Sequence, residues 1–206
     1  MSNVVLVESM PDGSYESVGM MECEMKNNSS YSNMDVCKKT VESKKEFQKL
    51  VTDLVKEFSK QTSLILHLCV HGNEYGIAFK GYDEANPSAD YCMLWDELIQ
   101  TVKPLNEAVN CNLILVFQAC KSSKLGEKMS NPDFCKYLIV GDGLVYSREL
   151  EPLFQFYKTY AETKNVKLAY EAMVKTKYYD VKHNEIQVSN VYKLFLNDEI
   201  KKGMIV

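Results

Sequence analysis

Arginine is almost absent from this chain of 206 residues. Arg148 is the single arginine, compared with 23 lysines. The cations are scattered along the sequence and the formal net charge is −4, so there is no basic stripe of the kind that binds nucleic acid. We therefore expect no nucleic-acid partner.

Long apolar runs are also missing. The longest, around residues 64–70 and 113–117, are far too short to cross a bilayer, and the first residues lack the charged and then apolar pattern of a signal segment. The seven cysteines form no CxxC pair, which argues against a zinc ribbon and against a secreted disulfide framework. We expect a cytosolic protein with reduced thiols, no membrane association and no metal.

Hydrophobic residues make up 46% of the chain, enough for one sizeable core, so we expect a single domain over residues 1–206. Ser43 and Glu46 form a capping box before residues of helical spacing, and 63–70 is an almost continuous apolar run typical of a central parallel strand. Further strands are expected at 4–7, 18–23, 113–117, 137–140 and 186–196, and further helices at 94–102, 149–162 and 166–177.

The connections between these elements are also predicted. A turn at 11–13 joins the first two strands, 26–35 is a loop, 71–73 is a turn that ends the strand before it, and Pro104 ends or kinks its helix. Strands that alternate with helices predict an α/β fold with a mainly parallel sheet covered by helices on both faces. In such sheets, sites form just beyond the carboxyl ends of the strands.

Two reactive side chains follow predicted strands. Cys120 comes just after 113–117 and His71 just after 63–70, so parallel strands would bring both to one edge of the sheet. An imidazole that takes the thiol proton and later protonates a leaving amine makes such a pair sufficient for acyl transfer. The turn at Gly72 would free its backbone N–H, which could join that of Cys120 in binding an oxyanion.

The segment Gln118-Ala119-Cys120, with a His-Gly pair 49 positions upstream, resembles the caspase signature. Together with residues 66–72, 95–98, 137–142 and 166–172, it is similar to the CHAT-type peptidases of the caspase-like superfamily over roughly 63–196. The resemblance implies a caspase-like three-layer sandwich and a cysteine endopeptidase acting on protein substrates. Lys121 and Ser122 depart from the family pattern, which has arginine, glutamine or glycine and then glycine.

Substrate selection is predicted less completely. The resemblance implies that Gln118 lines the pocket for the residue before the cut. Caspases hold an aspartate there with arginines, which is at odds with a chain whose one arginine, Arg148, follows the cysteine. Asp142 could instead favour a lysine or arginine substrate, or it could be an ordinary turn residue beside Gly141 and Gly143.

Regulation is implied by the resemblance alone, because many microbial caspase-like proteins act in immunity or programmed cell death. We expect a latent enzyme activated by a partner protein, a small signal ligand or a cleavage. The loop at 121–133, rich in Ser, Lys, Gly and Asn, is the first candidate for a mobile or cleavable segment and 26–35 is the second, with an ordinary surface loop as the alternative for each.

Three alternatives remain open. A caspase-fold scaffold without activity would have the same pattern. A flavodoxin-like ligand-binding domain is disfavoured because no strand is followed by a glycine-rich phosphate-binding turn, so no cofactor is expected. His67, Cys69 and His71 share one face of a strand, but such ligands are widely spaced and lack a fourth, and we expect His67 to be a structural histidine.

Overall fold

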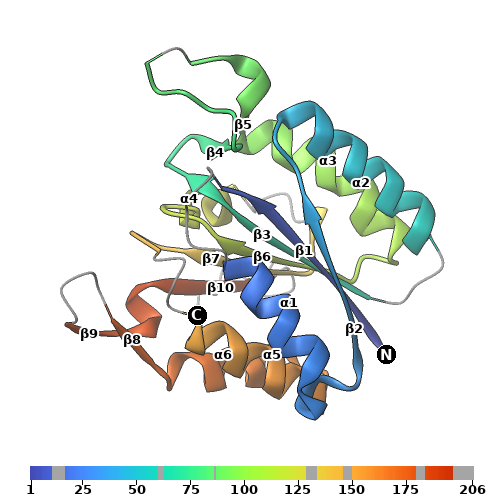
Figure 1. The fold of residues 1–206 in the computed structure, drawn as a ribbon, viewed down its shortest axis with the longest axis vertical. Coiled ribbons are helices and arrows are strands. Elements are labelled where there is room, and N and C mark those ends of the chain that lie inside the picture. Colours follow the sequence, from blue (N-terminus) through green and yellow to red (C-terminus); the bar gives the residue numbers. More distant parts are fainter. Residues whose placement is uncertain are drawn as a thin grey trace.

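The computed structural model describes residues 1–10, 17–59, 63–85, 87–128, 134–145, 150–179 and 184–196. At its centre six strands lie in the order β2-β1-β3-β6-β7-β10 (Figure 1). Their bounds are β1 Ser2–Ser9, β2 Met34–Thr40, β3 Leu64–Gly72, β6 Leu113–Gln118, β7 Tyr137–Gly141 and β10 Tyr192–Leu196. Neighbouring strands are parallel except β10, which is antiparallel to β7.

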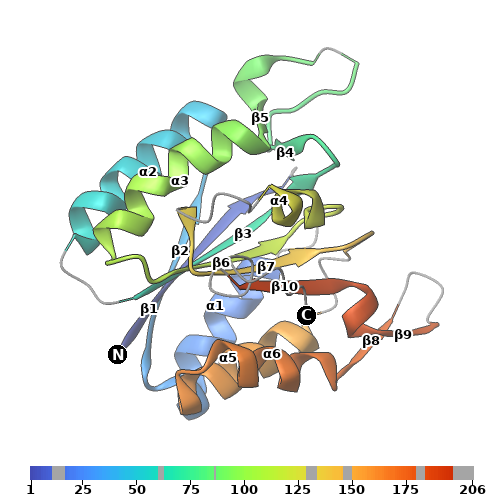
Figure 2. The same ribbon diagram turned by 180° about the vertical axis from the view of Figure 1, so that it is seen from behind.

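Helices cover both faces of the sheet, as the views from opposite sides show (Figures 1 and 2). One layer contains α2 (Lys44–Phe58) and α3 (Trp95–Ala108), and the other contains α1 (Ser17–Asn27), α5 (Glu151–Thr163) and α6 (Val166–Val174). Along β3, Leu66 and Leu68 join the core beneath α2 and α3, whereas Ile65 and Cys69 join the core beneath the other three helices. The predicted helix-covered, mainly parallel sheet is confirmed.

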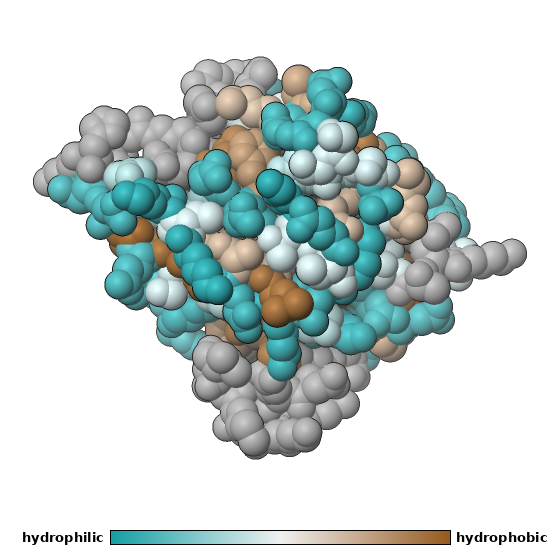
Figure 3. Space-filling view, turned by 90° about the horizontal axis from the view of Figure 1, so that it is seen from below, coloured by the Kyte–Doolittle hydropathy of each residue, from teal (hydrophilic) through white to brown (hydrophobic). Residues whose placement is uncertain are grey.

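The outer surface of the second helical layer is hydrophilic. Figure 3 looks from below Figure 1, where α1, α5 and α6 lie, and apolar residues form only small separate patches there. The amphipathic helices therefore direct their apolar side chains to the sheet. None of the helices within the described ranges is long and apolar enough to cross a membrane.

The capping box predicted the start of α2 correctly. Ser43 Oγ accepts the N–H of Glu46 at 3.3 Å, and the buried residues Phe47, Val51 and Leu54 follow at helical spacing. Pro104 was predicted to end or kink the next helix, and the first of these alternatives is wrong. Pro104 lies inside α3 on its exposed side, and the helix continues to Ala108.

The strand predicted at 18–23 is wrong, because this segment lies in α1. Val18, Met21 and Met25 are buried at helical spacing against the sheet, and Glu22 and Lys26 pair one turn apart at 2.8 Å. A short run of apolar residues does not distinguish the two-residue period of a strand from the 3.6-residue period of a helix. Here the apolar residues form the buried face of a helix. The turn predicted at 11–13 lies outside the described residues.

The loop predicted at 26–35 is too long, because it includes the end of α1, a 3₁₀ helix at Ser29–Tyr31 and the start of β2. The strand predicted at 186–196 is divided into β9 (Glu185–Gln187) and β10 by a 3₁₀ helix at Val188–Asn190. β9 pairs with β8 (Lys177–Tyr179), which begins where α6 was expected to continue.

A small hairpin extends one end of the sheet. β3 continues through His71 and Gly72, which pair antiparallel with β4 (Gly76–Ala78), and β4 pairs with β5 (Cys92–Leu94). A 3₁₀ helix at Ala89–Tyr91 precedes β5, and the connection projects above α3 in Figure 1. The predicted end of the strand before His71 is therefore wrong, and the turn follows Gly72.

Candidate active site

The predicted catalytic residues lie at the ends of neighbouring strands, His71 within the last residues of β3 and Cys120 just after β6. β3 and β6 run parallel, and the last residues paired between them are Cys69 and Gln118. His71 lies two residues after Cys69, and Cys120 lies two residues after Gln118. The register therefore carries both to the same level at the carboxyl edge of the sheet, where sites form in parallel sheets.

Two glycines hold the backbone at Cys120 from either side. A β-carbon on Gly72 would lie 2.6 Å from the Cys120 carbonyl oxygen, and one on Gly141 would lie 2.5 Å from the Ala119 carbonyl oxygen. Both distances are shorter than real β-carbons show, so only glycine fits at either position. The ends of β3 and β7 thus contact the turn after β6 through their backbones.

This turn continues through the two residues that depart from the caspase pattern. Lys121 has a φ of 53°, in the left-handed region, and its N–H donates to the Gly143 carbonyl at 2.8 Å. Ser122 Oγ donates to the Ala119 carbonyl at 2.9 Å and accepts the Gly141 N–H at 2.8 Å. The buried Ser122 therefore fixes the turn to the end of β7, before the short helix α4 (Ser123–Glu127).

The Cys120 thiol is partly buried and contacts the segment that follows β7. The Val145 N–H donates to Sγ at 3.4 Å, and Sγ lies 3.9 Å from the Val145 carbonyl oxygen. The backbone of Val145 therefore lies directly against the thiol of Cys120, the predicted nucleophile.

His71 is exposed, unlike the residues before it on β3. It is paired with Ala78 of β4, so the hairpin supports its backbone. Asn73 accepts the N–H groups of Tyr75 and Gly76 at 2.8 and 3.1 Å, which closes the turn directly after His71 and Gly72. The imidazole is therefore accessible to solvent on a well-anchored strand end.

The hairpin also orients the predicted oxyanion donor. Asn73 N–H donates to Gly76 carbonyl oxygen at 3.0 Å, so these two residues form a hydrogen-bonded pair. Such pairs alternate along an antiparallel ladder, which makes Gly72 and Ile77 the next, non-hydrogen-bonded pair. The Gly72 N–H consequently points away from β4.

His67 has a structural position in the core. Its Nδ1 lies 2.7 Å from the Tyr157 hydroxyl, and burial lowers its pKa to about 3 although hydrogen bonding with the Gln118 side chain opposes this shift. Burial likewise raises the pKa of Cys69 to about 11 although its Sγ lies 3.2 Å from Ser17 Oγ. Both side chains are thus held in their neutral forms inside the protein.

These contacts bear on the possibility of a metal site. His67 and Cys69 each form a hydrogen bond with a hydroxyl group from the second helical layer, that of Tyr157 and that of Ser17 respectively. Within the described ranges, no group of three histidine, cysteine, aspartate or glutamate side chains could hold a metal ion.

Gln118 is buried, with 3% of its surface exposed, and lies beside His67. Tyr192 of β10 pairs with Gly141 of β7, and its hydroxyl is buried and has no hydrogen-bond partner among the described residues. Burial raises the pKa of Tyr192 well above its usual value, and Cys120 is one of the groups that add to the shift. A buried hydroxyl without a partner is unusual in a folded protein.

Asp142 follows β7 and is bound within the protein. Burial raises the pKa of its carboxyl group, but hydrogen bonds from Lys193 and Ser123 outweigh this effect and lower it overall. Its carboxylate also forms an ion pair with Lys193 of β10, and its N–H donates to the Val191 carbonyl at 2.7 Å. The negative charge of Asp142 is therefore already partnered.

Sequence reasoning missed several residues that support the turn at Cys120. Ser122 was noted only as a departure from a motif, and Val145 and Tyr192 were not singled out. Asn73 carried a usable signal, since asparagine three residues before glycine is typical of a turn. The contacts of Val145 depend on how β7 lies against β6, which no local pattern in the sequence encodes.

The strand order, the antiparallel edge strand β10 and the two helical layers define a caspase-like α/β sandwich. Solved structures share this fold. A secreted C11 cysteine protease from Bacteroides thetaiotaomicron, in complex with an irreversible peptide inhibitor, matches with a TM-score of 0.58 at 13% identity, over 97% of this chain and 67% of that chain. The Drosophila initiator caspase Dronc matches with a TM-score of 0.57 at 12% identity, over 95% and 79%. No protein-family model and no curated protein matches the sequence.

Proposed function

We propose that this protein is a cysteine endopeptidase that cleaves protein substrates through Cys120 and His71. The observation that carries the proposal is the close approach of Gly72 to the Cys120 backbone, which sets the strand end bearing the histidine against the turn bearing the cysteine. The cysteine proteases among the structural neighbours support this at the level of the fold.

In the first half of the reaction, His71 takes the proton of the Cys120 thiol and Sγ attacks the carbonyl carbon of the scissile peptide bond. The carbonyl oxygen becomes an oxyanion, for which the N–H groups of Gly72 and Cys120 are the proposed donors. The carbon–nitrogen bond then breaks while His71 gives a proton to the leaving amine. The product is a thioester on Cys120.

In the second half, His71 takes a proton from water, and the resulting hydroxide equivalent attacks the thioester carbonyl. The carbon–sulfur bond breaks, the acid product leaves, and the thiol is restored. The exposure of His71 supports this role, since the same imidazole must meet the amine and then water. Neither metal nor cofactor takes part in the proposed steps.

Gln118 and Asp142 are proposed to select the residue before the cut. Gln118 lies two residues before Cys120 in the sequence. Asp142 follows Gly141, whose backbone approaches Ala119 next to Cys120. A basic substrate side chain would have to compete with Lys193 for Asp142. We propose that this competition limits the preference for lysine or arginine.

Restraint of the enzyme belongs to the same proposal. The Val145 backbone lies against Cys120 Sγ, so an activating protein, a small signal ligand or a cleavage that moves this segment would change access to the thiol. Residues 1–206 are proposed to act as a single domain in the cytosol. A role in microbial immunity or cell death, and closeness to CHAT-type peptidases, rest on the sequence resemblance alone.

Labelling with peptidyl acyloxymethyl ketones, varied at the residue before the warhead, tests the proposal. Wild-type protein is compared with Cys120→Ala, His71→Ala and the matched control Cys23→Ala, which removes an exposed cysteine on α1. We expect a single adduct that maps to Cys120, persists in Cys23→Ala and is lost in His71→Ala. Intact-mass spectrometry with peptide mapping provides the measurement.

One result would contradict the enzyme, and another would show that it is latent. Labelling spread over several cysteines and indifferent to His71, both alone and after addition of cell lysate, would favour a caspase-fold scaffold. Selective labelling that appears only with lysate would instead support a latent enzyme. The preferred side chain before the warhead would then define what Gln118 and Asp142 accept.

A further inference from the structure

A second feature of the candidate site is a cavity that His71 and Gly72 line and Cys120 does not. It has a volume of about 430 Å³ and lies between the end of β3 and the β4–β5 hairpin. The residues that line it include His71, Tyr75, Ile77, Tyr82, Met93 and Leu94. The volume is sufficient for one or two side chains of a peptide.

The walls of this cavity are firmly built. Trp95 Nε1 donates to the Glu74 carbonyl and the Trp95 N–H donates to the Tyr75 carbonyl, both at 3.1 Å. A β-carbon on Gly76 would lie 2.1 Å from the Met93 carbonyl oxygen, so β4 and β5 lie in direct backbone contact. The turn that carries Tyr75 is thus fixed to α3 at its base.

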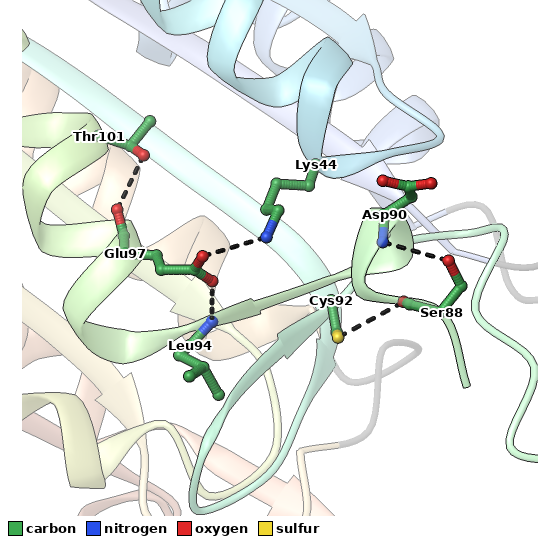
Figure 4. Close-up of polar contacts among 7 residues, drawn as sticks. All are labelled: Lys44, Ser88, Asp90, Cys92, Leu94, Glu97 and Thr101. Atoms are coloured by element: carbon green, nitrogen blue, oxygen red, sulfur yellow. Dashed lines mark hydrogen bonds and ion pairs between the residues drawn. The ribbon is translucent and has the colours of Figure 1, made fainter.

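The other side of the hairpin is anchored as well (Figure 4). The Leu94 N–H donates to Glu97 at 3.0 Å, and the same carboxylate group of Glu97 binds Lys44 of α2 at 3.1 Å. Cys92 Sγ donates to the Ser88 carbonyl at 3.6 Å. The cavity therefore exists before any ligand arrives, which reduces the ordering cost of binding.

The lining is apolar and exposes large side chains to solvent. Ile77 and Met93 form a buried floor, whereas Tyr75 is 68% exposed and Leu94 is 56% exposed at the rim. Exposed apolar groups gathered at a concave site are typical of a binding site rather than of an ordinary surface. Glu84 is the one carboxylate among the described residues that line the cavity, so it disfavours acidic ligands.

The position of His71 decides which part of the substrate this cavity faces. In the proposed function, on which this inference rests, His71 protonates the amine that leaves. The amine and the residue that carries it must therefore lie on the His71 side of Cys120. We propose that this cavity binds the first residue on the amine side of the scissile bond and selects a bulky apolar or aromatic side chain there.

Acyl transfer to added amines tests this pocket apart from the first half of the reaction. A peptidyl thioester with the acyl sequence preferred in the labelling forms the Cys120 thioester, and amino-acid amides then compete with water for it. The amine attacks the carbonyl, the carbon–sulfur bond breaks, a carbon–nitrogen bond forms, and the amine proton passes through His71 to the thiolate. The ratio of amide to acid product, measured by mass spectrometry, reports occupancy of the pocket.

We expect leucinamide and phenylalaninamide to be used at least about tenfold better than glycinamide, because filling an apolar pocket discriminates by roughly 10- to 200-fold. Glutamic acid amide should be the poorest acceptor. Tyr75→Ser and Leu94→Ser should reduce the advantage of leucinamide, and Glu84→Lys should improve use of the glutamic acid amide. Leu168→Ser on α6, which removes another exposed apolar side chain, is the matched control and should change nothing.

The outcomes separate the two proposals. If the Cys120 thioester forms and all amides are used equally, or if the rim variants behave like Leu168→Ser, the pocket is wrong and the peptidase stands. If no thioester forms on Cys120 with any donor, with or without lysate, both proposals fall. A preference for leucinamide that Tyr75→Ser and Leu94→Ser reduce supports the pocket.

Discussion

The interior of the sheet and its carboxyl edge each contain a histidine and a cysteine, in opposite environments. His67 and Cys69 lie inside the helix-covered sheet, where burial holds the imidazole and the thiol neutral. His71, two residues further on, is exposed, and Cys120, just after the neighbouring strand β6, is partly buried beside the backbone N–H of Val145. Position along a strand, rather than residue type, thus separates a structural histidine from a candidate catalytic one.

Replacing each histidine should separate the two regions most strongly. His71→Ala should reduce peptide cleavage by about 10²- to 10⁴-fold, the usual contribution of a general acid and base, and leave thermal unfolding nearly unchanged. His67→Ala should lower the free energy of unfolding by about 2–4 kcal/mol, because it leaves a cavity and an unpaired Tyr157 hydroxyl. Specific activity of the folded fraction and chemical denaturation measure the two effects. Equal losses of activity in both variants would contradict the comparison.

Substitution of glycine at the strand end should disturb the chemistry more than the fold. Gly72→Ala would bring a β-carbon against the Cys120 carbonyl, so the turn must shift and the proposed oxyanion donors move with it. We expect activity to fall by about 10²-fold, the scale set by loss of one oxyanion donor. Gly143→Ala is the control, since a β-carbon there meets no atom within 4 Å. Steady-state kinetics on a peptide substrate make the measurement, and similar activities in the two variants would sink the idea.

The buried histidine should also make stability depend on pH. His67 has a folded pKa of about 3 against an ordinary value of 6.5, so its contribution is fully present above pH 6.5 and is lost as pH falls toward 3. The free energy of unfolding should decrease by up to about 1.4 kcal/mol per pH unit in this window. Urea unfolding of wild type and His67→Gln at several pH values tests this, because the difference between the two curves isolates His67. Parallel curves would mean that this imidazole does not titrate as described.

The smallest expected effect concerns the backbone directly after the candidate nucleophile. Lys121 adopts a left-handed conformation that costs a non-glycine residue roughly 1–2 kcal/mol, which Lys121→Gly would relieve at a smaller cost in chain entropy. We expect the free energy of unfolding to rise by up to about 1 kcal/mol. Lys124→Gly, in the short helix α4, is the contrasting variant and should be destabilising. A lower stability of Lys121→Gly would show that the conformation is not strained.

The sequence predicted the parallel sheet well because its buried strands are continuous apolar runs. The same runs placed His71 and Cys120 near strand ends, since the position of a residue relative to an apolar run can be read from the local sequence. Prediction failed at α1, where Val18 and Met21 fit a strand as well as a helix until burial decides. It also failed at β2, an edge strand with several polar residues whose pairing with β1 is a long-range property.

The candidate site was predictable only in part for the same reason. The two reactive side chains follow from strand ends, but their supports come from distant segments. Val145 contacts Cys120 from the segment after β7, and Tyr192 of β10 pairs with Gly141, whose backbone approaches Ala119. The tight approach of Gly141 to Ala119 follows from how neighbouring strands pack, which composition does not reveal.

The attachment of β10 to the segment after β7 has a consequence for the time at which activity first appears. Val191 and Lys193 bind Asp142, which belongs to the segment after β7. Val145 of that segment contacts Cys120. During synthesis on the ribosome, His71 and Cys120 emerge long before these supports. The newborn chain therefore carries both reactive groups without these supports, and the proposed peptidase site is complete only once β10 has left the exit tunnel and paired with β7.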